Sequence, residues 1–369
     1  MVDHTPLDVA TLSAAAQKAL GSGPARMMAS RGLVPLPPSE QVLVLYQLSI
    51  DGDQNLANAA RATAMGLPDK LLASALADPT VDARALDLFA QLVSDRAVAF
   101  EAIVSNASVT DATIAFLAEN GGPNEVDRIS TNEQRLLRHP AIIAAMYQNK
   151  LARMSTVDRV IELAVRNHVR VPGLAAWDEI ARALQGAPPA TPESDAIFAA
   201  AAAAVSGADD TLTKGDAEQV LPEQDAEAAA EKKAVPIERL SVPHKIRLAT
   251  VGNAVARAIL IRDPVKIVAV AAIKSPGVTE FEAALYASNH SLSEDVIRYI
   301  STKREWTKLY GIKYSLCRNP KTPMTEAMRQ LPFLHERDLA QLAKSKGVAT
   351  AVTAQARKLV AQRANKQKK

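Results

Sequence analysis

The stretch from Thr302 to Lys321 carries the residue types with the most chemical potential in this chain. Its basic side chains alternate with Trp306, Tyr310 and Tyr314. Basic groups contact phosphates and aromatic rings stack on bases, so this composition suits a single-stranded nucleic-acid surface. The apolar positions also recur about every three to four residues, which predicts a helix with a core face and a solvated basic back. We favour the helix interpretation and keep the nucleic-acid surface as the alternative.

The candidate partner-binding residues are the cations of this stretch, its tryptophan and two lysines further along the chain. They are Lys303, Arg304, Trp306, Lys308, Lys313, Arg318, Lys321, Lys344 and Lys346. The chain then ends in a basic tail, but cations complement any helix C-terminus, so the tail adds little to the prediction.

No group of residues has the spacing that catalysis or metal binding requires. None of the six histidines lies at the spacing of a helical metal pair. Gly121-Gly122 lacks the Lys and Ser/Thr of a phosphate loop. We therefore expect no enzyme, and no catalytic, cofactor-binding or metal-binding residues. The single cysteine, Cys317, excludes an intrachain disulfide, and its apolar surroundings predict a buried thiol.

Charge is sorted along the chain. Residues 1–185 carry 16 Lys and Arg against 20 Asp and Glu, residues 186–236 carry 3 against 10, and residues 237–369 carry 24 against 10. A basic block of this size favours an acidic partner, either a nucleic acid or an acidic protein segment. The acidic, Pro- and Ala-rich middle predicts a flexible tether with a transient helix around 195–205. This tether is also a candidate mask for the basic block.

A recurring helix-start pattern positions these groups. A small polar residue, often followed by Pro, precedes an aliphatic residue, a capping residue and an apolar-periodic helix. The predicted N-caps are Asp82, Thr110, Thr279 and Ser293. Thr279 also has Glu282 three residues on, which predicts a capping box.

The spacing of this pattern predicts repeated helix pairs. Asp78 and Asn106 are 28 residues apart, and Asn289 and Asn319 are 30 apart. A period of this length is typical of stacked helical hairpins. Abundant Ala, an aromatic content of 4% and the lack of period-two strands predict an all-α fold.

The fold predicted is two HEAT-like helical-repeat, α-solenoid blocks joined by a flexible acidic linker. Its parts are an N-terminal helix and lead-in (1–34), an N-terminal repeat domain (35–185), the linker (186–236), a basic C-terminal repeat domain (237–360) and a basic tail (361–369).

Three motifs carry a resemblance to a known group. They are Asn319-Pro-Lys-Thr-Pro323, Arg304-Glu-Trp306 with Tyr310, and Ile261-Arg-Asp-Pro264. With them the chain resembles bacterial helical-repeat proteins of the HEAT-like or variant leucine-rich kind, well over 240–360 and loosely over 35–170. The resemblance implies fold and no activity, since these are helix-start motifs.

The sequence thus predicts a non-enzymatic scaffold that binds an acidic protein partner through the basic C-terminal block. Nucleic-acid binding by the same surface is the alternative. No secretory signal is visible, and the longest apolar run, Ala196–Val205, is shorter than the roughly 20 residues of a membrane span. We expect a cytoplasmic protein without a membrane span and without cofactors.

Overall fold

The computed structural model describes residues 4–21, 23–185, 187, 190–206, 215, 217–219 and 236–367. In these residues every regular element is a helix, which confirms the all-α prediction. The chain forms two compact units that divide between Gly173 and Leu174.

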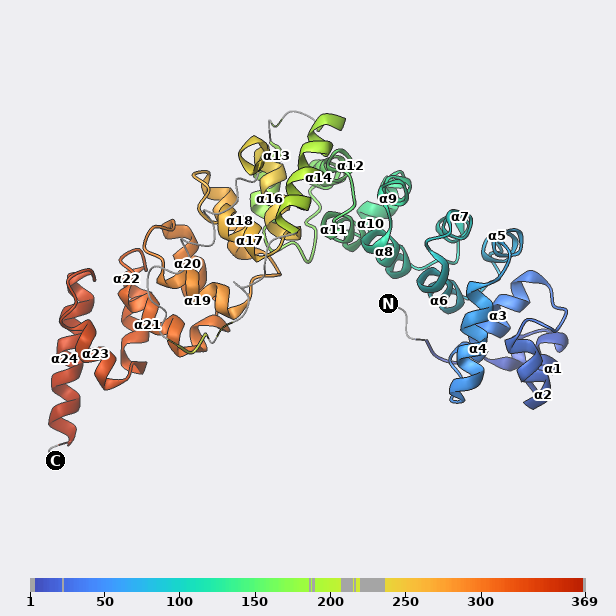
Figure 1. Cartoon of the computed structure of the whole chain (residues 1–369), viewed down its shortest axis with the longest axis horizontal. Helices are drawn as coiled ribbons and strands as arrows, with labels where there is room; N and C mark the ends of the chain where they lie inside the picture. The colour runs from blue at the N-terminus through green and yellow to red at the C-terminus, as the bar shows by residue number, and fades with distance from the viewer. Residues whose placement is uncertain are drawn as a thin grey trace. The chain divides into compact units, whose positions relative to one another are not determined.

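Unit 1 is a succession of short helices, most of them two to three turns long (Figure 1). Its elements are η1 (Val9–Thr11), α1 (Ala14–Gly21), α2 (Gly23–Ser30), α3 (Pro38–Ser49), α4 (Gln54–Met65), α5 (Asp69–Leu76), α6 (Ala83–Val93), α7 (Ala97–Ser105), α8 (Asp111–Asn120), α9 (Pro123–Ser130), α10 (Glu133–Arg138), α11 (Ala141–Gln148) and α12 (Met154–Arg166).

Helices in unit 1 pack on the second helix along the chain. Thus α3 contacts α5, α5 contacts α7, α4 contacts α6, and α6 contacts α8. A short helix cannot bury its own apolar stripe, so the stacking of neighbours builds the core. Leu45, Leu72, Leu86 and Phe89 are fully buried in this way.

Unit 2 has the same all-helical construction (Figure 1). Its elements are α13 (Trp177–Leu184), α14 (Pro192–Ser206), η3 (Pro236–Arg239), α16 (Val242–Val251), α17 (Ala254–Leu260), α18 (Lys266–Lys274), α19 (Glu280–Ser288), α20 (Glu294–Thr302), η4 (Trp306–Lys308), α21 (Tyr310–Arg318), α22 (Met324–Gln330), η5 (Leu331–Phe333), α23 (Glu336–Leu342) and α24 (Thr350–Gln367).

Alternate helices also contact each other in unit 2: α16 packs on α18, α18 on α20, and α19 on α21. At the C-terminal end, α23 packs on α24, and Tyr314, Cys317, Leu339 and Val352 belong to one buried cluster. The predicted caps Asp82, Thr110, Thr279 and Ser293 all accept main-chain hydrogen bonds at their helix starts. The capping box of Thr279 is present as predicted.

Three buried asparagines that follow helices bind main-chain carbonyls far back in the chain. Asn106, the C-cap of α7, donates through Nδ2 to the carbonyls of Leu76 (2.7 Å) and Asp78 (2.9 Å), and its Oδ1 accepts from the Ser108 amide (2.8 Å). Two other C-cap asparagines, Asn149 and Asn319, make the same three kinds of bond. These side chains explain the period of about 28 to 30 residues, because each reaches back by that distance.

The predicted linker differs from the structure over Pro192–Ser206, which forms α14. Phe198 of α14 is buried, its ring meets the His244 ring edge-on with 6.2 Å between centroids, and the Arg247 guanidinium lies 5.0 Å from the Phe198 centroid. Asn253 Nδ2 donates to the Val205 carbonyl (2.6 Å). Phe198, Ala201 and Val205 are all buried, so several contacts hold this Ala-rich helix, which composition predicts to be transient.

Most of the remaining linker, 207–214, 216 and 220–235, lies outside the described residues, so its predicted flexibility and masking role stay predictions. The predicted N-terminal domain, 35–185, includes the residues of α13, and in the structure α13 packs on α16 and α18 of unit 2. Trp177 and Ile180 are buried there, so the amphipathic face of α13 sets the boundary.

Candidate basic interaction surface

The aromatic residues of the stretch 302–321 are engaged in packing. Trp306 is 3% exposed, and its ring meets the Tyr299 ring edge-on with 6.0 Å between centroids. The structure also divides the stretch at Leu309 between η4 and α21, where the periodicity predicts one continuous helix. The Trp306 ring lies in the core of unit 2. It therefore offers no open face on which a nucleic-acid base could stack.

The two tyrosines have partners as well. Tyr314 is 2% exposed. Tyr310 donates its hydroxyl to Asp338 (2.5 Å) and lies 4.1 Å from the His335 ring, centroid to centroid. Burial, assisted by the Asp338 carboxylate, raises the pKa of Tyr310 to about 12. Base stacking needs exposed rings, and the three aromatic residues of this stretch do not supply them.

Several predicted cations have structural partners. Lys321 Nζ donates to the carbonyls of Ser291 (3.0 Å) and Leu292 (2.5 Å). Lys313 Nζ donates to the Lys308 carbonyl (2.8 Å). The Lys303 ammonium lies 3.9 Å from the Trp306 centroid, a cation–π contact. Two longer aromatic contacts join Arg318 to Tyr314 at 5.7 Å and Lys313 to Phe333 at 5.8 Å. Lys303, Lys313, Arg318 and Lys321 thus stabilise the local fold. Their charges are therefore less available to a partner.

The other predicted cations project into solvent. Arg304 and Lys308 are exposed near η4, while Lys344 and Lys346 are exposed between α23 and α24. Within the described part of the chain none of these four side chains forms an ion pair. The predicted site therefore separates into a structural group and an exposed group.

A groove that the sequence did not reveal lies between α13, α18 and α20, with a volume of about 500 Å³. It combines apolar side chains with charged ones from all three helices. Its lining residues are Glu179, Arg182, Lys266, Ile267, Val270, Lys274, Asp295, Arg298, Tyr299 and Thr302. The next residue after Thr302 is Lys303, so the groove adjoins the start of the predicted basic stretch.

The groove has an excess of positive charge. Lys274 Nζ donates to both carboxylate oxygens of Glu179 (2.9 and 3.0 Å), which neutralises one of the two acidic groups in the lining. Arg182 and Lys266 are exposed and form no ion pair with any described residue. Arg298 is held at the rim by Glu294, which accepts from it at 2.5 Å. Arg182 and Lys266 are thus the available cations in a groove that Ile267 and Val270 also line.

Burial raises the pKa of Tyr299, which lines this groove, so its hydroxyl stays protonated near neutral pH and can donate a hydrogen bond. Arg182 and Lys266 are 84 positions apart in the chain. No sequence pattern joins them, because only the packing of α13 on α18 brings them to one groove. The only signal of this groove in the sequence is the presence of basic residues near the ends of amphipathic helices.

No protein-family model, curated protein or solved structure matches the chain. Among the described helices, the longest has 18 residues, and none has the length and apolar character of a bilayer span. The described residues contain no cluster of three or more His, Cys, Asp or Glu side chains arranged to hold a metal ion.

Proposed function

We propose that the chain is a non-enzymatic interaction scaffold and that its C-terminal unit binds an acidic protein segment in the groove between α13, α18 and α20. The observation that carries the proposal is the lining itself. Arg182, Lys266 and Arg298 line the groove together with the apolar side chains of Ile267 and Val270. With Lys274, its cations outnumber the carboxylates of Glu179 and Asp295. A peptide that alternates carboxylates with apolar side chains complements both features.

We further propose that each unit is a HEAT-like α-solenoid block. The support is the packing of helices on their second neighbours in both units, together with the asparagines that link one repeat to the next. Solenoids present continuous surfaces to partners along their stacked helices. An elongated segment is therefore the form of partner that this fold suits.

Binding of a labelled peptide to the full chain tests the function. The probe is a 12-residue peptide that alternates Glu with Leu or Phe, and a peptide with Lys in place of each Glu is the comparison. In the variant Arg182→Glu/Lys266→Glu we expect affinity to fall about tenfold or more, about 1.4 kcal/mol, because both available cations are reversed.

Lys70→Glu/Lys150→Glu is the matched control, because it makes the same charge change at two exposed lysines of unit 1. We expect this control to bind within about twofold of the unchanged chain. Equal loss of affinity in both variants, or equal binding of the acidic and basic peptides, would refute the proposal.

Nucleic-acid binding is the second candidate function. Exposed Arg304, Lys308, Lys344 and Lys346 favour it, since phosphate contacts need only exposed cations. The packed state of Trp306 and Tyr314 places it second, because no ring of this pair is open to stack on a base. Titration of short single- and double-stranded DNA and RNA at several salt concentrations decides the matter. If the logarithm of the binding constant falls linearly with the logarithm of the salt concentration, nucleic-acid binding is supported. If no binding is seen at low salt, this function is eliminated.

A further inference from the structure

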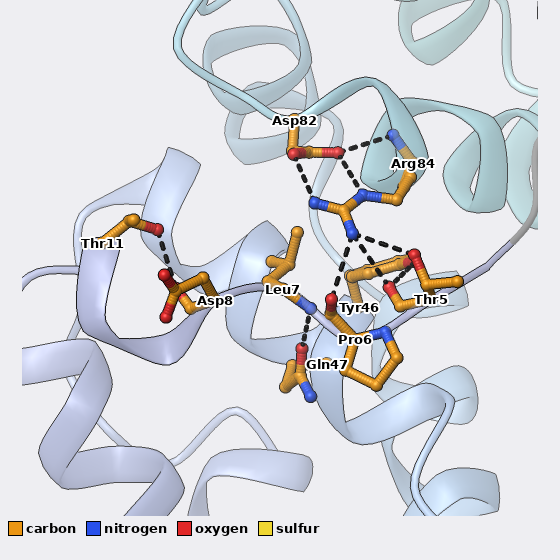
Figure 2. Close-up of polar contacts among 9 residues, drawn as sticks. All are labelled: Thr5, Pro6, Leu7, Asp8, Thr11, Tyr46, Gln47, Asp82 and Arg84. Carbon is orange, nitrogen blue, oxygen red and sulfur yellow. Dashed lines mark hydrogen bonds and ion pairs between the residues drawn. The ribbon is translucent and has the colours of Figure 1, made fainter.

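The segment His4–Asp8 lies extended across unit 1, far from the groove proposed above in sequence and in a separate compact unit. Figure 2 shows Thr5, Pro6 and Leu7 between the side chains of α3 and the start of α6. The short η1 follows, capped by the Asp8 carboxylate, which accepts from the Ala10 amide (3.0 Å). The segment forms no helix or strand of its own, so its position depends on side chains of α3 and α6.

Most of the contacts that hold this segment are made to its main chain. Arg84 Nη1 donates to the carbonyls of Thr5 (3.3 Å) and Pro6 (3.0 Å), and also to the Thr5 hydroxyl (3.0 Å). Tyr46 donates its hydroxyl to the same Thr5 carbonyl (2.9 Å), and Gln47 Oε1 accepts from the Leu7 amide (2.8 Å). Figure 2 shows these groups converging on three successive residues of the segment. Main-chain groups of this kind are present in any extended peptide.

The receiving side chains are held in place independently of the segment. Asp82 is the N-cap of α6 and accepts from Arg84 through both carboxylate oxygens, at 2.9 Å from Nε and 2.9 Å from Nη2. The hydrogen-bonded Arg84 lowers the pKa of Asp82, so this pair stays ionised near neutral pH. Because Nε and Nη2 are occupied by Asp82, Nη1 is the part of the guanidinium that faces the segment.

Besides the Thr5 hydroxyl, the side chains of His4 and Leu7 supply specific contacts. Leu7 is 7% exposed, whereas Thr5 and Pro6 are exposed. His4 Nε2 lies 2.9 Å from the carboxylate of Asp87, a group on α6 that is 1% exposed. Asp87 also accepts from Gln91 and Thr113, so it is a fixed acceptor for a donor side chain. The order of the segment is thus donor, two exposed residues, and an apolar anchor.

We propose that this face of unit 1, formed by Tyr46, Gln47, Asp82, Arg84 and Asp87, is a binding site for an extended peptide segment. His4–Asp8 is its resident occupant, and a partner segment with a hydrogen-bond donor three residues before a leucine displaces it. When the resident segment leaves, buried Asp87 and the Tyr46 hydroxyl lose partners, which is costly unless another peptide replaces them. Recognition through main-chain groups and one apolar anchor is a known way in which proteins bind extended peptides.

Hydrogen exchange in the unaltered full chain is the first test. If the segment is a reversible occupant, the Leu7 amide exchanges at least about a hundredfold faster than the core amides of α6, because it opens locally while unit 1 stays folded. Exchange of the Leu7 amide at the rate of the α6 core would overturn the proposal, since the segment would then be released only by global unfolding.

A displacement experiment is the second test. The probe is a fluorescent peptide that copies residues 4–12. The resident segment competes at high effective concentration in the unaltered chain, so we expect the probe to bind the full-length Leu7→Asp variant at least about tenfold more tightly. Val9→Asp is the matched control, because Val9 is 37% exposed, and it should bind like the unaltered chain.

The double variant Leu7→Asp/Arg84→Ala should lose the increased affinity for the probe. A probe peptide in which Asp replaces the residue equivalent to Leu7 should not bind. A folded Leu7→Asp chain that takes up no probe refutes the proposal. So does uptake that Arg84→Ala leaves unchanged. Neither outcome bears on the groove of unit 2, so the two proposals succeed or fail separately.

Discussion

Arg257 and Glu282 form a bidentate ion pair inside unit 2, with Nε to Oε1 and Nη2 to Oε2 both at 2.9 Å. Their side chains are 5% and 1% exposed, and they join α17 to α19. Glu282 also accepts from the Thr279 amide (2.9 Å), so one carboxylate closes the capping box and neutralises the arginine. A local helix-start signal and a long-range contact thus depend on the same side chain.

Replacement of Glu282 by Gln should lower the free energy of unfolding by about 3–5 kcal/mol, because it leaves the buried Arg257 without a counter-charge. Urea denaturation followed by circular dichroism measures the change. Glu294→Gln is the control, since it removes an exposed partner of Arg298, and it should cost at most about 0.5 kcal/mol. Equal effects of the two substitutions would show that the buried pair does not stabilise unit 2.

The helix starts are predictable from sequence because a cap and the amides that it binds lie within four residues. Asp82, Thr110, Thr279 and Ser293 all cap the helices for which they were predicted. The all-α class follows from the same local cues.

Partners distant in the chain are not predictable in this way. The asparagines appear in the sequence as period markers, but the carbonyls that they bind lie 30 and 32 residues earlier in the chain. Arg182 and Lys266 meet only through the packing of α13 on α18. For Trp306 the sequence favours a helix core face and leaves a nucleic-acid surface as the alternative, and the 3% exposure of its side chain places it in the core.

Asn319 is expected to be essential for the stability of unit 2. Asn319→Ala leaves the carbonyls of Ala287 and Asn289 and the amide of Lys321 without their partner. Unsatisfied buried groups of this kind should cost about 2–4 kcal/mol in a thermal or urea unfolding experiment. Asn120→Ala should cost less than about 0.5 kcal/mol, because the Asn120 side chain is exposed and binds only one carbonyl of its own helix.

Trp306 is expected to act as a core residue. Trp306→Ala should reduce the free energy of unfolding by about 3–5 kcal/mol, since it removes a buried ring that contacts Tyr299 and Lys303. Phe333→Ala serves as the control, because Phe333 is 63% exposed, and it should change stability by about 0.5 kcal/mol or less. Unchanged stability of the Trp306→Ala chain would reopen the stacking interpretation.

Asp111 is expected to give unit 1 a pH-dependent share of its stability. Burial alone would raise the pKa of Asp111, but the guanidiniums of Arg138 and Arg135 outweigh it and hold this pKa below its usual value. A carboxyl with a lowered folded-state pKa stabilises above its unfolded pKa of about 3.9, and the gain is lost as pH falls through the folded value.

Asp111→Asn should therefore be less stable than the unaltered chain at pH 7, and the difference should close as the pH falls below about 4. Urea midpoints measured across this range test the prediction. Asp95 is exposed and has no ion pair with a described residue, so Asp95→Asn should show no such trend. If the difference in stability between Asp111→Asn and the unaltered chain is the same at all pH values, Asp111 is not the source of this pH dependence.

Cys317 is expected to be unreactive in the folded chain. The side chain is 1% exposed, its sulfur lies 3.6 Å from the Ala327 carbonyl, and burial raises the pKa of the thiol to about 12. The thiolate is the reactive form, so both its scarcity and its burial slow alkylation. Iodoacetamide at pH 8, followed by mass spectrometry, should modify the native chain at least about a hundredfold more slowly than the urea-unfolded chain.

The alkylation rate should also report the opening of the cluster around Cys317. Leu339→Ala removes a fully buried member of that cluster, so it should accelerate labelling by promoting local opening. Phe89→Ala creates a comparable loss in the core of unit 1 and should leave the rate nearly unchanged, because Cys317 belongs to the other compact unit. Rapid labelling of the unaltered native chain would contradict the burial of the Cys317 thiol. Equal acceleration by both substitutions would show that exposure of the thiol does not depend on the cluster around it.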